Sequence, residues 1–377
     1  MPEPDLLPPV PPLAILNCSS FNCSLANLSA FHGDECYADQ PLFVALAVAY
    51  SAVAFLGVTG NLALIVLIWR QRELSNATSV LIANLSASDL LMALVCLPFT
   101  FVYTFMDHWA FGSAMCKINS LAQCTSVSVS IFSLVLIAVE RHQLIVRPRG
   151  WRPSAFQACL GVAISWGLAL LTAMPFLLFS VTTDAPLQQL PAILREHYRG
   201  KVVCMEQWPS RQFKLTYTTT MLLLQYVAPL VFIFICYLKI YVRLRQRKSV
   251  MERMRENKYR SHETKRINVM LFSIVVAFAI CWLPLNVFNA ISDWNHEATM
   301  NCTHNPLFLL CHLTAMCSIC INPIFYGFLN RNFQRDMQSF RFCKRLSTRE
   351  EEYDTVAMST VQSDLSKTSL KFSSTDI

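Results

Sequence analysis

The sequence predicts an all-α membrane protein, a bundle of seven transmembrane helices, and three observations lead to this fold class. First, 54% of the 377 residues are hydrophobic and only 15% are charged, whereas charged residues make up about a quarter of a typical soluble domain. Second, Lys and Arg gather in alternate connections between apolar segments, as in multi-pass proteins. Third, each of seven apolar segments is long enough for a helix to cross a bilayer; they cover residues 42–69, 80–105, 121–139, 159–179, 217–238, 267–291 and 307–329.

The charge distribution also predicts the direction of the chain. The connections after the first, third and fifth segments are basic, above all residues 243–248 and 253–266. The connections around Asp107 and Asp293 are nearly free of Lys and Arg, and residues 180–214 are mixed. Because basic connections stay on the cytoplasmic side, we expect a plasma-membrane protein with its N-terminus outside and its C-terminus inside. This topology explains the net charge of +7 better than nucleic-acid binding does.

Residues 1–41 are expected to form a glycosylated extracellular tail. No Lys or Arg precedes Arg70 and the segment starts proline-rich, so we expect a soluble tail instead of a cleavable signal and expect the first span to act as the insertion signal. Glycosylation sequons begin at Asn17, Asn22 and Asn27. Similar matches at two asparagines beside or inside a span are attributed to chance.

The third segment connects two compartments, from Cys116 outside to Glu140-Arg141-His142 inside. Cys116 and Cys204 both fall in segments assigned outside, so we expect a disulfide between them. A second candidate pair is Cys36 with Cys302, although Cys18 and Cys23 could compete or pair with each other. Most other cysteines lie singly in apolar runs, as small buried hydrophobes.

Several polar residues lie inside the spans, where a charge costs at least about 2.5 kcal/mol at mid-bilayer. Asp89 on the second span can form a polar cluster with Asn61, Ser130, Ser318 and Asn322 on other spans. Such a cluster is either a cation site of the sodium type or a switch, or it is a structural network of hydrogen bonds. Prolines deep in the spans are expected to kink them, namely Pro98, Pro175, Pro229, Pro284 and Pro323. Trp282 beside Pro284 predicts a hinge.

The bundle is expected to span residues 42–330 and to be followed by an amphipathic helix, residues 331–343, that lies on the inner membrane surface. Cys343 is a candidate for palmitoylation, with an unmodified thiol as the alternative. Residues 344–377 are polar and Ser/Thr-rich. We expect them to form a disordered cytoplasmic tail that kinases phosphorylate.

The order of motifs along the chain resembles the rhodopsin-like G-protein-coupled receptors. The motifs are Gly60-Asn61, Leu85-Ser-Ala-Ser-Asp89, Cys116, Glu140-Arg141-His142, Trp166, Pro229, Cys281-Trp282-Leu283-Pro284 and Asn322-Pro323-Ile324-Phe325-Tyr326. Longer strings, including residues 101–109, 130–145, 257–266 and 357–360, resemble the neuropeptide Y receptor family, most closely its type 1 members. Type 6 and the pancreatic polypeptide receptor are the nearest alternatives.

The resemblance implies a ligand and a set of contacts. The family binds amidated peptides ending in Arg-x-Arg-Tyr (neuropeptide Y, peptide YY and pancreatic polypeptide) and couples to inhibitory G proteins, which lower adenylate cyclase activity, with arrestin and receptor kinases acting on the tail. By position, Gln123 would contact the amidated end and Asp293 a ligand arginine. Gln225, Trp282, Leu285, Asn289 and His312 would surround that end, and Tyr103, Asp107, Trp109 and Phe308 would form the upper wall.

Two residues depart from the type 1 pattern in this region. Asn286 stands in place of a threonine and Ser292 in place of a phenylalanine. Both lie on the pocket side of the sixth span, so we expect them to affect small antagonists and subtype selectivity more than peptide binding.

Charge considered alone agrees with a cationic ligand. Asp107, Asp293 and Glu297 lie in outer segments where no neighbouring lysine is expected to compete; the alternative is that they are ordinary solvated loop acids. An amide at Gln123 argues against an amine ligand, and the absence of lysine from residues 307–329 excludes a retinal Schiff base.

The expected mechanism is a shift between two bundle arrangements. The ligand presses on Gln123 and the layer above Trp282, and the sixth span pivots at Pro284. Arg141, held at rest by Glu140, then meets a G-protein helix, while Asn322-Pro323 and Tyr326 repack and a cation at Asp89 favours the resting form. A transporter or channel is the main rival, but the halves show no inverted repeat. No catalytic set points to an enzyme.

Overall fold

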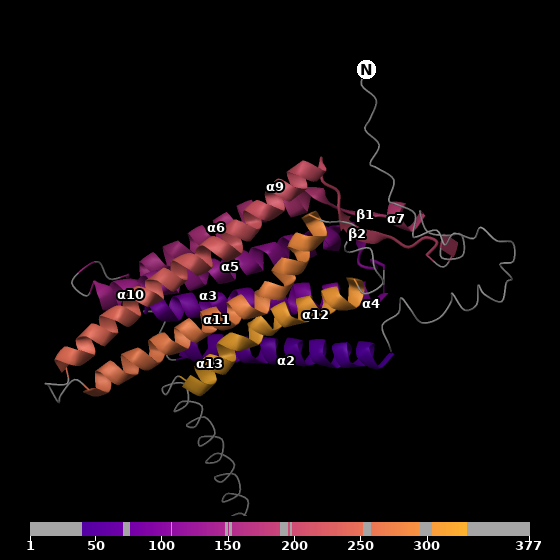
Figure 1. Ribbon diagram of the computed structural model, residues 1–377. Helices are drawn as coiled ribbons and strands as arrows, with labels where there is room; N and C mark the ends of the chain where they lie inside the picture. Colours follow the sequence, from indigo (N-terminus) through magenta and orange to yellow (C-terminus); the bar gives the residue numbers. More distant parts are fainter. Residues whose placement is uncertain are drawn as a thin grey trace, which may run out of the picture.

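The computed structural model describes residues 40–70, 76–106, 108–147, 150, 153–188, 195–196, 198–251, 258–294 and 304–329. In this part of the chain seven helices are long and apolar enough to cross a membrane, which confirms the predicted fold class (Figure 1). The spans are Val44–Arg70, Ala77–Tyr103, Gly112–Val146, Ala155–Phe179, Arg211–Gln246, Thr264–Trp294 and Leu307–Tyr326.

Four spans are single helices and three are broken by short irregular turns. The single helices are α2 (Gln40–Arg70), α5 (Gly112–Val146), α6 (Ala155–Phe179) and α11 (Lys258–Trp294). The second span consists of α3 (Ala77–Leu91), a π-helical turn (Met92–Cys96) and α4 (Leu97–Met106). The fifth is α9 (Arg211–Leu222), a π-helical turn (Leu223–Val227) and α10 (Ala228–Met251), and the seventh is α12 (His304–Met316), a 3-10 turn (Cys317–Cys320) and α13 (Ile321–Leu329).

The three irregular turns come directly before prolines. Pro98, Pro229 and Pro323 each follow one of them within two or three residues. Proline has no N–H to donate and its ring crowds the carbonyl four residues earlier, so the preceding turn re-forms with a different hydrogen-bond register. Pro175 and Pro284 instead lie inside continuous helices.

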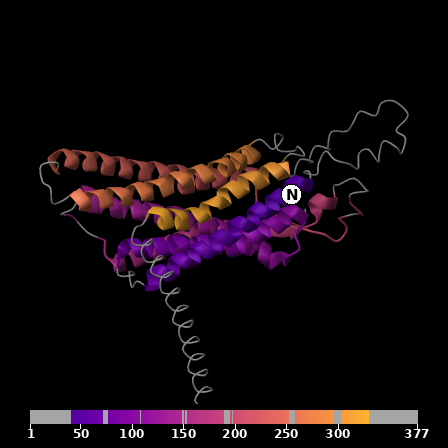
Figure 2. The same ribbon diagram turned by 90° about the horizontal axis from the view of Figure 1, so that it is seen from below.

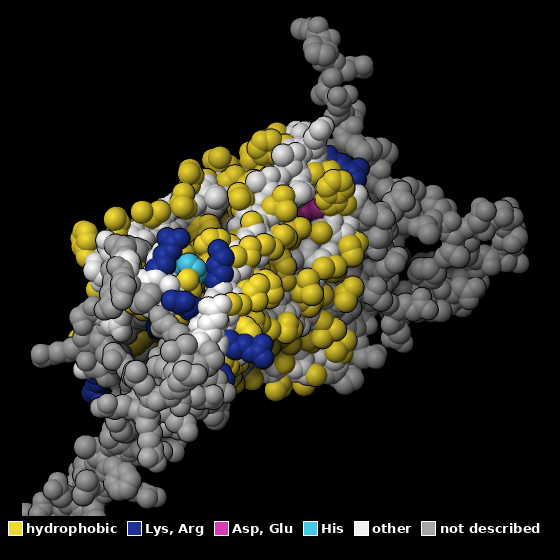
Figure 3. Space-filling model, turned by 60° about the vertical axis from the view of Figure 1, so that its left-hand side comes forward, with side chains coloured by type: hydrophobic (Ala, Val, Ile, Leu, Met, Phe, Trp, Pro, Cys, Tyr) yellow, Lys and Arg dark blue, Asp and Glu magenta, His cyan; other side chains and the backbone are white. Residues whose placement is uncertain are grey.

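The helices run side by side along one axis in both ribbon views (Figure 1 and Figure 2). The third span, α5, is central and packs against α3, α6 and α10 as well as the hairpin strand described below. Large hydrophobic side chains face outward from the bundle, such as Phe156 with 78% of its surface exposed, and they cover much of the flank in Figure 3. A soluble protein rarely exposes apolar surface on this scale, whereas a bilayer covers it.

A two-stranded hairpin follows α6 and covers one end of the bundle, which we call the hairpin end. Strand β1 (Ser180–Thr183) pairs antiparallel with β2 (Val203–Glu206), with Thr182 opposite Cys204; a short helix, α7 (Ala185–Gln188), lies in the connection between them. The predicted disulfide joins Cys116 at the start of α5 to Cys204, with Cα atoms 5.7 Å apart. The mixed charge of residues 180–214 indicates a loop but does not predict these strands.

Some predictions fall outside the described residues and stay predictions. They concern the tail sequons at Asn17, Asn22 and Asn27, the Cys36–Cys302 pair, Asp107, Glu297, the amphipathic helix at residues 331–343, Cys343 and residues 344–377. The two inner sequon matches are described: Asn76 caps α3, and Asn84 is buried, donating to Ser133 Oγ and accepting from Trp166 Nε1, each at 2.8 Å. Both therefore have structural roles.

Candidate functional site

Two adjoining cavities open among α5, the fifth span, α11 and the hairpin. The upper cavity, near the hairpin, has a volume of about 580 Å³, and the lower one, deeper in the bundle, about 260 Å³. Both are lined by Ser120, Phe176, Glu206, Met221, Gln225, Asn286 and Asn289. They therefore adjoin each other between the hairpin and the bundle core.

The lower cavity brings together five of the residues predicted to contact a ligand and Asn286, which was expected on the pocket side of the sixth span; the five are Gln123, Gln225, Trp282, Leu285 and Asn289. The Trp282 indole Nε1 donates to Ser318 Oγ at 3.1 Å, which connects this cavity to the seventh span. Gln225 Nε2 donates to Ser128 Oγ at 2.5 Å, and Asn286 Nδ2 donates to the Trp282 carbonyl at 2.8 Å. The walls thus offer amide groups and aromatic surface without a formal charge apart from Glu206, suited to a polar uncharged group.

Three other predicted contact residues lie away from both cavities. His312 is fully buried, with Nδ1 2.9 Å from the Tyr50 hydroxyl, and its ring stacks on Phe308. The Tyr103 hydroxyl donates to the Cys204 carbonyl at 3.1 Å, while the Trp109 backbone N–H donates to Val202 at 2.7 Å. Tyr103 and Trp109 therefore hold the hairpin, and their predicted contact with a ligand gains no support. Phe308 does line the upper cavity.

A group of charges lies at the upper cavity, and it corrects one expectation. Lys214 Nζ is 2.8 Å from Asp293 Oδ1, so a neighbouring lysine does compete for this carboxylate. The competing lysine belongs to α9, far from Asp293 in sequence, which is why inspection of the local sequence missed it. Ser292, on the same turn as Asp293, lines this cavity and donates to the Phe288 carbonyl at 2.9 Å.

Glu206, which the sequence analysis did not single out, lines both cavities. Its Oε2 accepts a hydrogen bond from Trp208 Nε1 at 2.7 Å. Burial raises the pKa of the Glu206 carboxyl, and the nearby Asp293 charge adds to this, while the Trp208 hydrogen bond and the Lys214 charge lower the pKa. The available signal in the sequence was a carboxylate two residues after Cys204, which was expected to form a disulfide.

The predicted polar cluster around Asp89 is largely present. Asn322 Nδ2 donates to Asp89 Oδ2 at 2.6 Å, and Asp89, Ser130, Ser318 and Asn322 line one small cavity of about 10 Å³. Asn61 instead donates to the carbonyls of Gly57 and Ile319, which ties α2 to the seventh span. The buried Asn322 Oδ1 has no hydrogen-bond partner among the described residues, so the cavity offers hard oxygen donors of the kind that small cations prefer.

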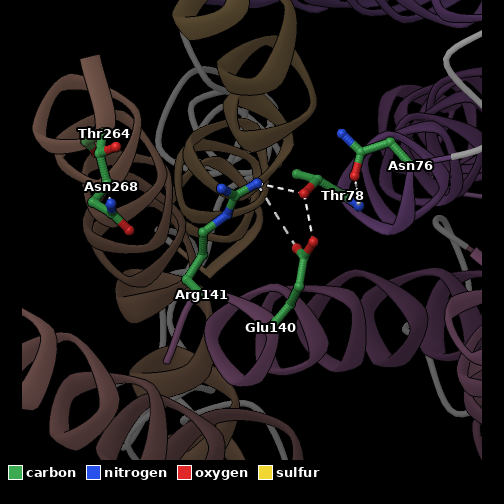
Figure 4. A network of polar contacts seen from close by, with 6 residues as sticks. All are labelled: Asn76, Thr78, Glu140, Arg141, Thr264 and Asn268. Atoms are coloured by element: carbon green, nitrogen blue, oxygen red, sulfur yellow. Dashed lines mark hydrogen bonds and ion pairs between the residues drawn. The ribbon is translucent and has the colours of Figure 1, made fainter. Parts of the chain in front are cut away.

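At the opposite end of the bundle, the Arg141 end, three side chains form a closed network (Figure 4). Arg141 Nη2 lies 3.8 Å from Glu140 Oε2, as expected for a resting pair. The Thr78 hydroxyl of α3 donates to Glu140 Oε1 at 2.6 Å and accepts a hydrogen bond from Arg141 Nη2. Glu140 is buried, so this network holds α5 against α3. Thr78 was not predicted, because nothing local to it indicates a contact with residues on another span.

The seven spans carry a disulfide-anchored hairpin, a cavity above Trp282, a polar cluster around the intramembrane Asp89 and an arginine network at the opposite end. Together these features define a rhodopsin-type seven-helix receptor. The sequence model described as 7 transmembrane receptor (rhodopsin family) matches residues 60–326.

Similar proteins narrow the class further. The chain is 55% identical over 356 residues to neuropeptide Y receptor type 1 of Xenopus laevis, an alignment that covers 94% of this chain and 96% of that protein. It is 51% identical over 349 residues to neuropeptide Y receptor type 6 of Oryctolagus cuniculus, covering 92% and 94%. With type 4 of Mus musculus the identity is 46% over 341 residues, covering 90% of each. The chain belongs to the neuropeptide Y receptor family, a family of multi-pass membrane receptors.

Proposed function

We propose that the protein is a plasma-membrane receptor for amidated peptides of the neuropeptide Y, peptide YY and pancreatic polypeptide class. The observation that carries the proposal is the pair of adjoining cavities, with amide and aromatic groups in the lower one and carboxylates in the upper one. A peptide ending in Arg-x-Arg-Tyr amide carries the complementary groups: an uncharged amide end for the floor and guanidinium groups for the mouth.

In this proposal Gln123, Gln225, Asn286 and Asn289 receive the amidated tyrosine above Trp282. Amide side chains both donate and accept hydrogen bonds, which matches a terminal carboxamide. Asp293 receives a guanidinium. The hairpin end faces the cell exterior, and the tail sequons and the Cys116–Cys204 disulfide are consistent with an oxidising compartment.

The transmitted signal is a change at the Arg141 end. Peptide contacts above Trp282 favour movement of α11 about Pro284, and Arg141 leaves Glu140 and Thr78 to bind the α-subunit of an inhibitory G protein. Adenylate cyclase activity then falls. Arrestin and receptor kinases act on the cytoplasmic tail. Asp89, Ser130, Ser318 and Asn322 hold a sodium ion that stabilises the resting arrangement.

Competition binding tests the proposal. Membranes from cells that express the chain are incubated with each of the three amidated peptides, with and without a non-hydrolysable GTP analogue. We expect tight binding of neuropeptide Y and peptide YY that the nucleotide weakens, since coupling between peptide and G protein is reciprocal. Preference for pancreatic polypeptide would assign the chain to the neighbouring subtype, and ligand-induced ion current without GTP exchange would favour a channel or transporter.

A further inference from the structure

The upper cavity contains two carboxylates and one ammonium group, so its charges do not balance. Asp293 and Glu206 both line it, and Lys214 also lines it and pairs with Asp293 at 2.8 Å. Glu206 forms no ion pair with any residue that the structure describes, and its described hydrogen bond comes from the neutral Trp208 indole. Glu206 is half-buried, and a carboxylate that is partly removed from water without a cation beside it is costly. The two carboxylates have one cation between them to share, so a second cation bound in the cavity would balance the charge.

We propose that Lys214 is an internal counter-ion, which occupies Asp293 in the free receptor and transfers to Glu206 when a guanidinium group of the peptide binds Asp293. The inference rests on the proposed function, because it requires an arginine-bearing ligand. In this inference Lys214 and Glu206 together free Asp293 to bind the arginine of that ligand.

The free acceptor oxygens determine which cation suits which carboxylate. Asp293 is contacted by Lys214 through Oδ1, and its Oδ2 has no described partner. Once Lys214 leaves Oδ1, both oxygens of Asp293 are available to a planar guanidinium, which binds carboxylates through two parallel hydrogen bonds. Glu206 already uses Oε2 for Trp208. It retains one oxygen, which suits an ammonium acting as a point charge.

The positions of the three groups allow the transfer. Lys214 has 38% of its side chain exposed, whereas Asp293 has 12%. The flexible stem of a lysine costs little to redirect when the head is still in contact with water. The charge of Lys214 already acts on Glu206, and both line the upper cavity. When a peptide covers this cavity and excludes water, an unpaired Glu206 becomes costlier still, which favours arrival of the ammonium.

A double-mutant cycle tests the transfer. Glu206→Gln removes the second acceptor, Lys214→Met removes the transferred ammonium, and each is measured alone and combined by peptide competition binding. In the unmodified background Glu206→Gln is expected to lower peptide affinity about tenfold, the value of a hydrogen bond to a charged group. In the Lys214→Met background the same change is expected to alter affinity less than about threefold, because no ammonium remains to be transferred.

A matched ligand gives the second arm. Citrulline is a neutral analogue of arginine, so a peptide in which citrulline replaces the arginine that binds Asp293 should not displace Lys214. We expect Glu206→Gln to leave the affinity of that peptide unchanged. Equal losses from Glu206→Gln with and without Lys214 would overturn the transfer and indicate that Glu206 binds the peptide directly. Failure of the unmodified receptor to bind any of the amidated peptides would overturn both this inference and the proposed function, whereas binding without the coupling overturns the transfer alone.

Discussion

Replacing Thr78 by valine should activate the receptor without a ligand. The Thr78 hydroxyl joins the two charged residues of the Arg141 network: it donates to Glu140 at 2.6 Å and accepts from Arg141. Valine has nearly the same shape but cannot form either contact. The loss falls on the resting arrangement alone, since the proposed active arrangement moves Arg141 away from both partners.

The size of the effect follows from these contacts. A hydrogen bond to a charged group contributes about 1.5–3 kcal/mol. The direct Arg141–Glu140 contact at 3.8 Å remains after the substitution, so we take the lower end, which corresponds to roughly a tenfold change in the equilibrium. If about 1% of the unliganded receptor is in the active arrangement, Thr78→Val raises this to about 10%.

Basal binding of a slowly hydrolysed GTP analogue measures this population in membranes without peptide. Thr78→Ser is the matched control, because it keeps the hydroxyl and loses one methyl group; it should behave like the unmodified receptor. Equal basal exchange for the valine and serine variants, at equal surface expression, would mean that Thr78 does not hold the resting state and would refute the reasoning.

Three further predictions follow from the described contacts. Gly60→Val should reduce thermal stability and surface expression, because a Cβ there would lie 2.7 Å from Pro323; Gly167→Val, with no atom within 4 Å, is the control in a melting assay. Asp89→Asn should abolish the effect of sodium on agonist affinity, which binding in sodium chloride and choline chloride compares; a retained effect would exclude this cavity as the sodium site. Peptide affinity should rise with pH from mildly acidic conditions, because the raised pKa of Glu206 extends its protonated form to higher pH and only the ionised form can receive the Lys214 ammonium; the rise should not exceed the roughly tenfold loss expected for Glu206→Gln. The groups around Glu206 are Trp208 on its own segment, Lys214 and Tyr217 on α9, Cys124 on α5 and Asp293 on α11. A pH effect on peptide affinity that survives Glu206→Gln would therefore come from another of these groups.

The seven spans were predictable because a bilayer imposes a simple requirement on composition and length. Their ends were not. The third segment was predicted at residues 121–139, yet α5 runs from Gly112 to Val146, and α11 begins at Lys258, nine residues before the apolar segment at 267–291. Hydrophobicity marks only the part of a helix that lies in hydrocarbon, and the backbone continues to form helix beyond it.

The functional residues also differ in whether the local sequence is enough to identify them. Motif positions located Arg141, Asp89 and Trp282, and the structure places each in a network or cavity. Thr78, Lys214 and the hairpin could not be found in this manner, because each depends on partners 20 or more residues away. His312 shows a limit of transferring positions from a family. It was expected to contact the ligand, but it packs against Tyr50 and Phe308 and lines neither cavity.

The fold also explains why Lys214, and not Glu206, is the group that moves in the charge cluster. Glu206 is fixed on both sides: Cys204 two residues before it is bonded to α5, and the Gln207 backbone N–H after it donates to the Phe179 carbonyl at 2.8 Å. Asp293 lies on the last turns of α11 and is mostly covered. Two carboxylates at fixed positions that share one cavity with a flexible cation form a system with two arrangements. In the proposed transfer, a ligand cation shifts this system by binding one of the two carboxylates. The disulfide therefore contributes to ligand recognition by keeping the second position in place.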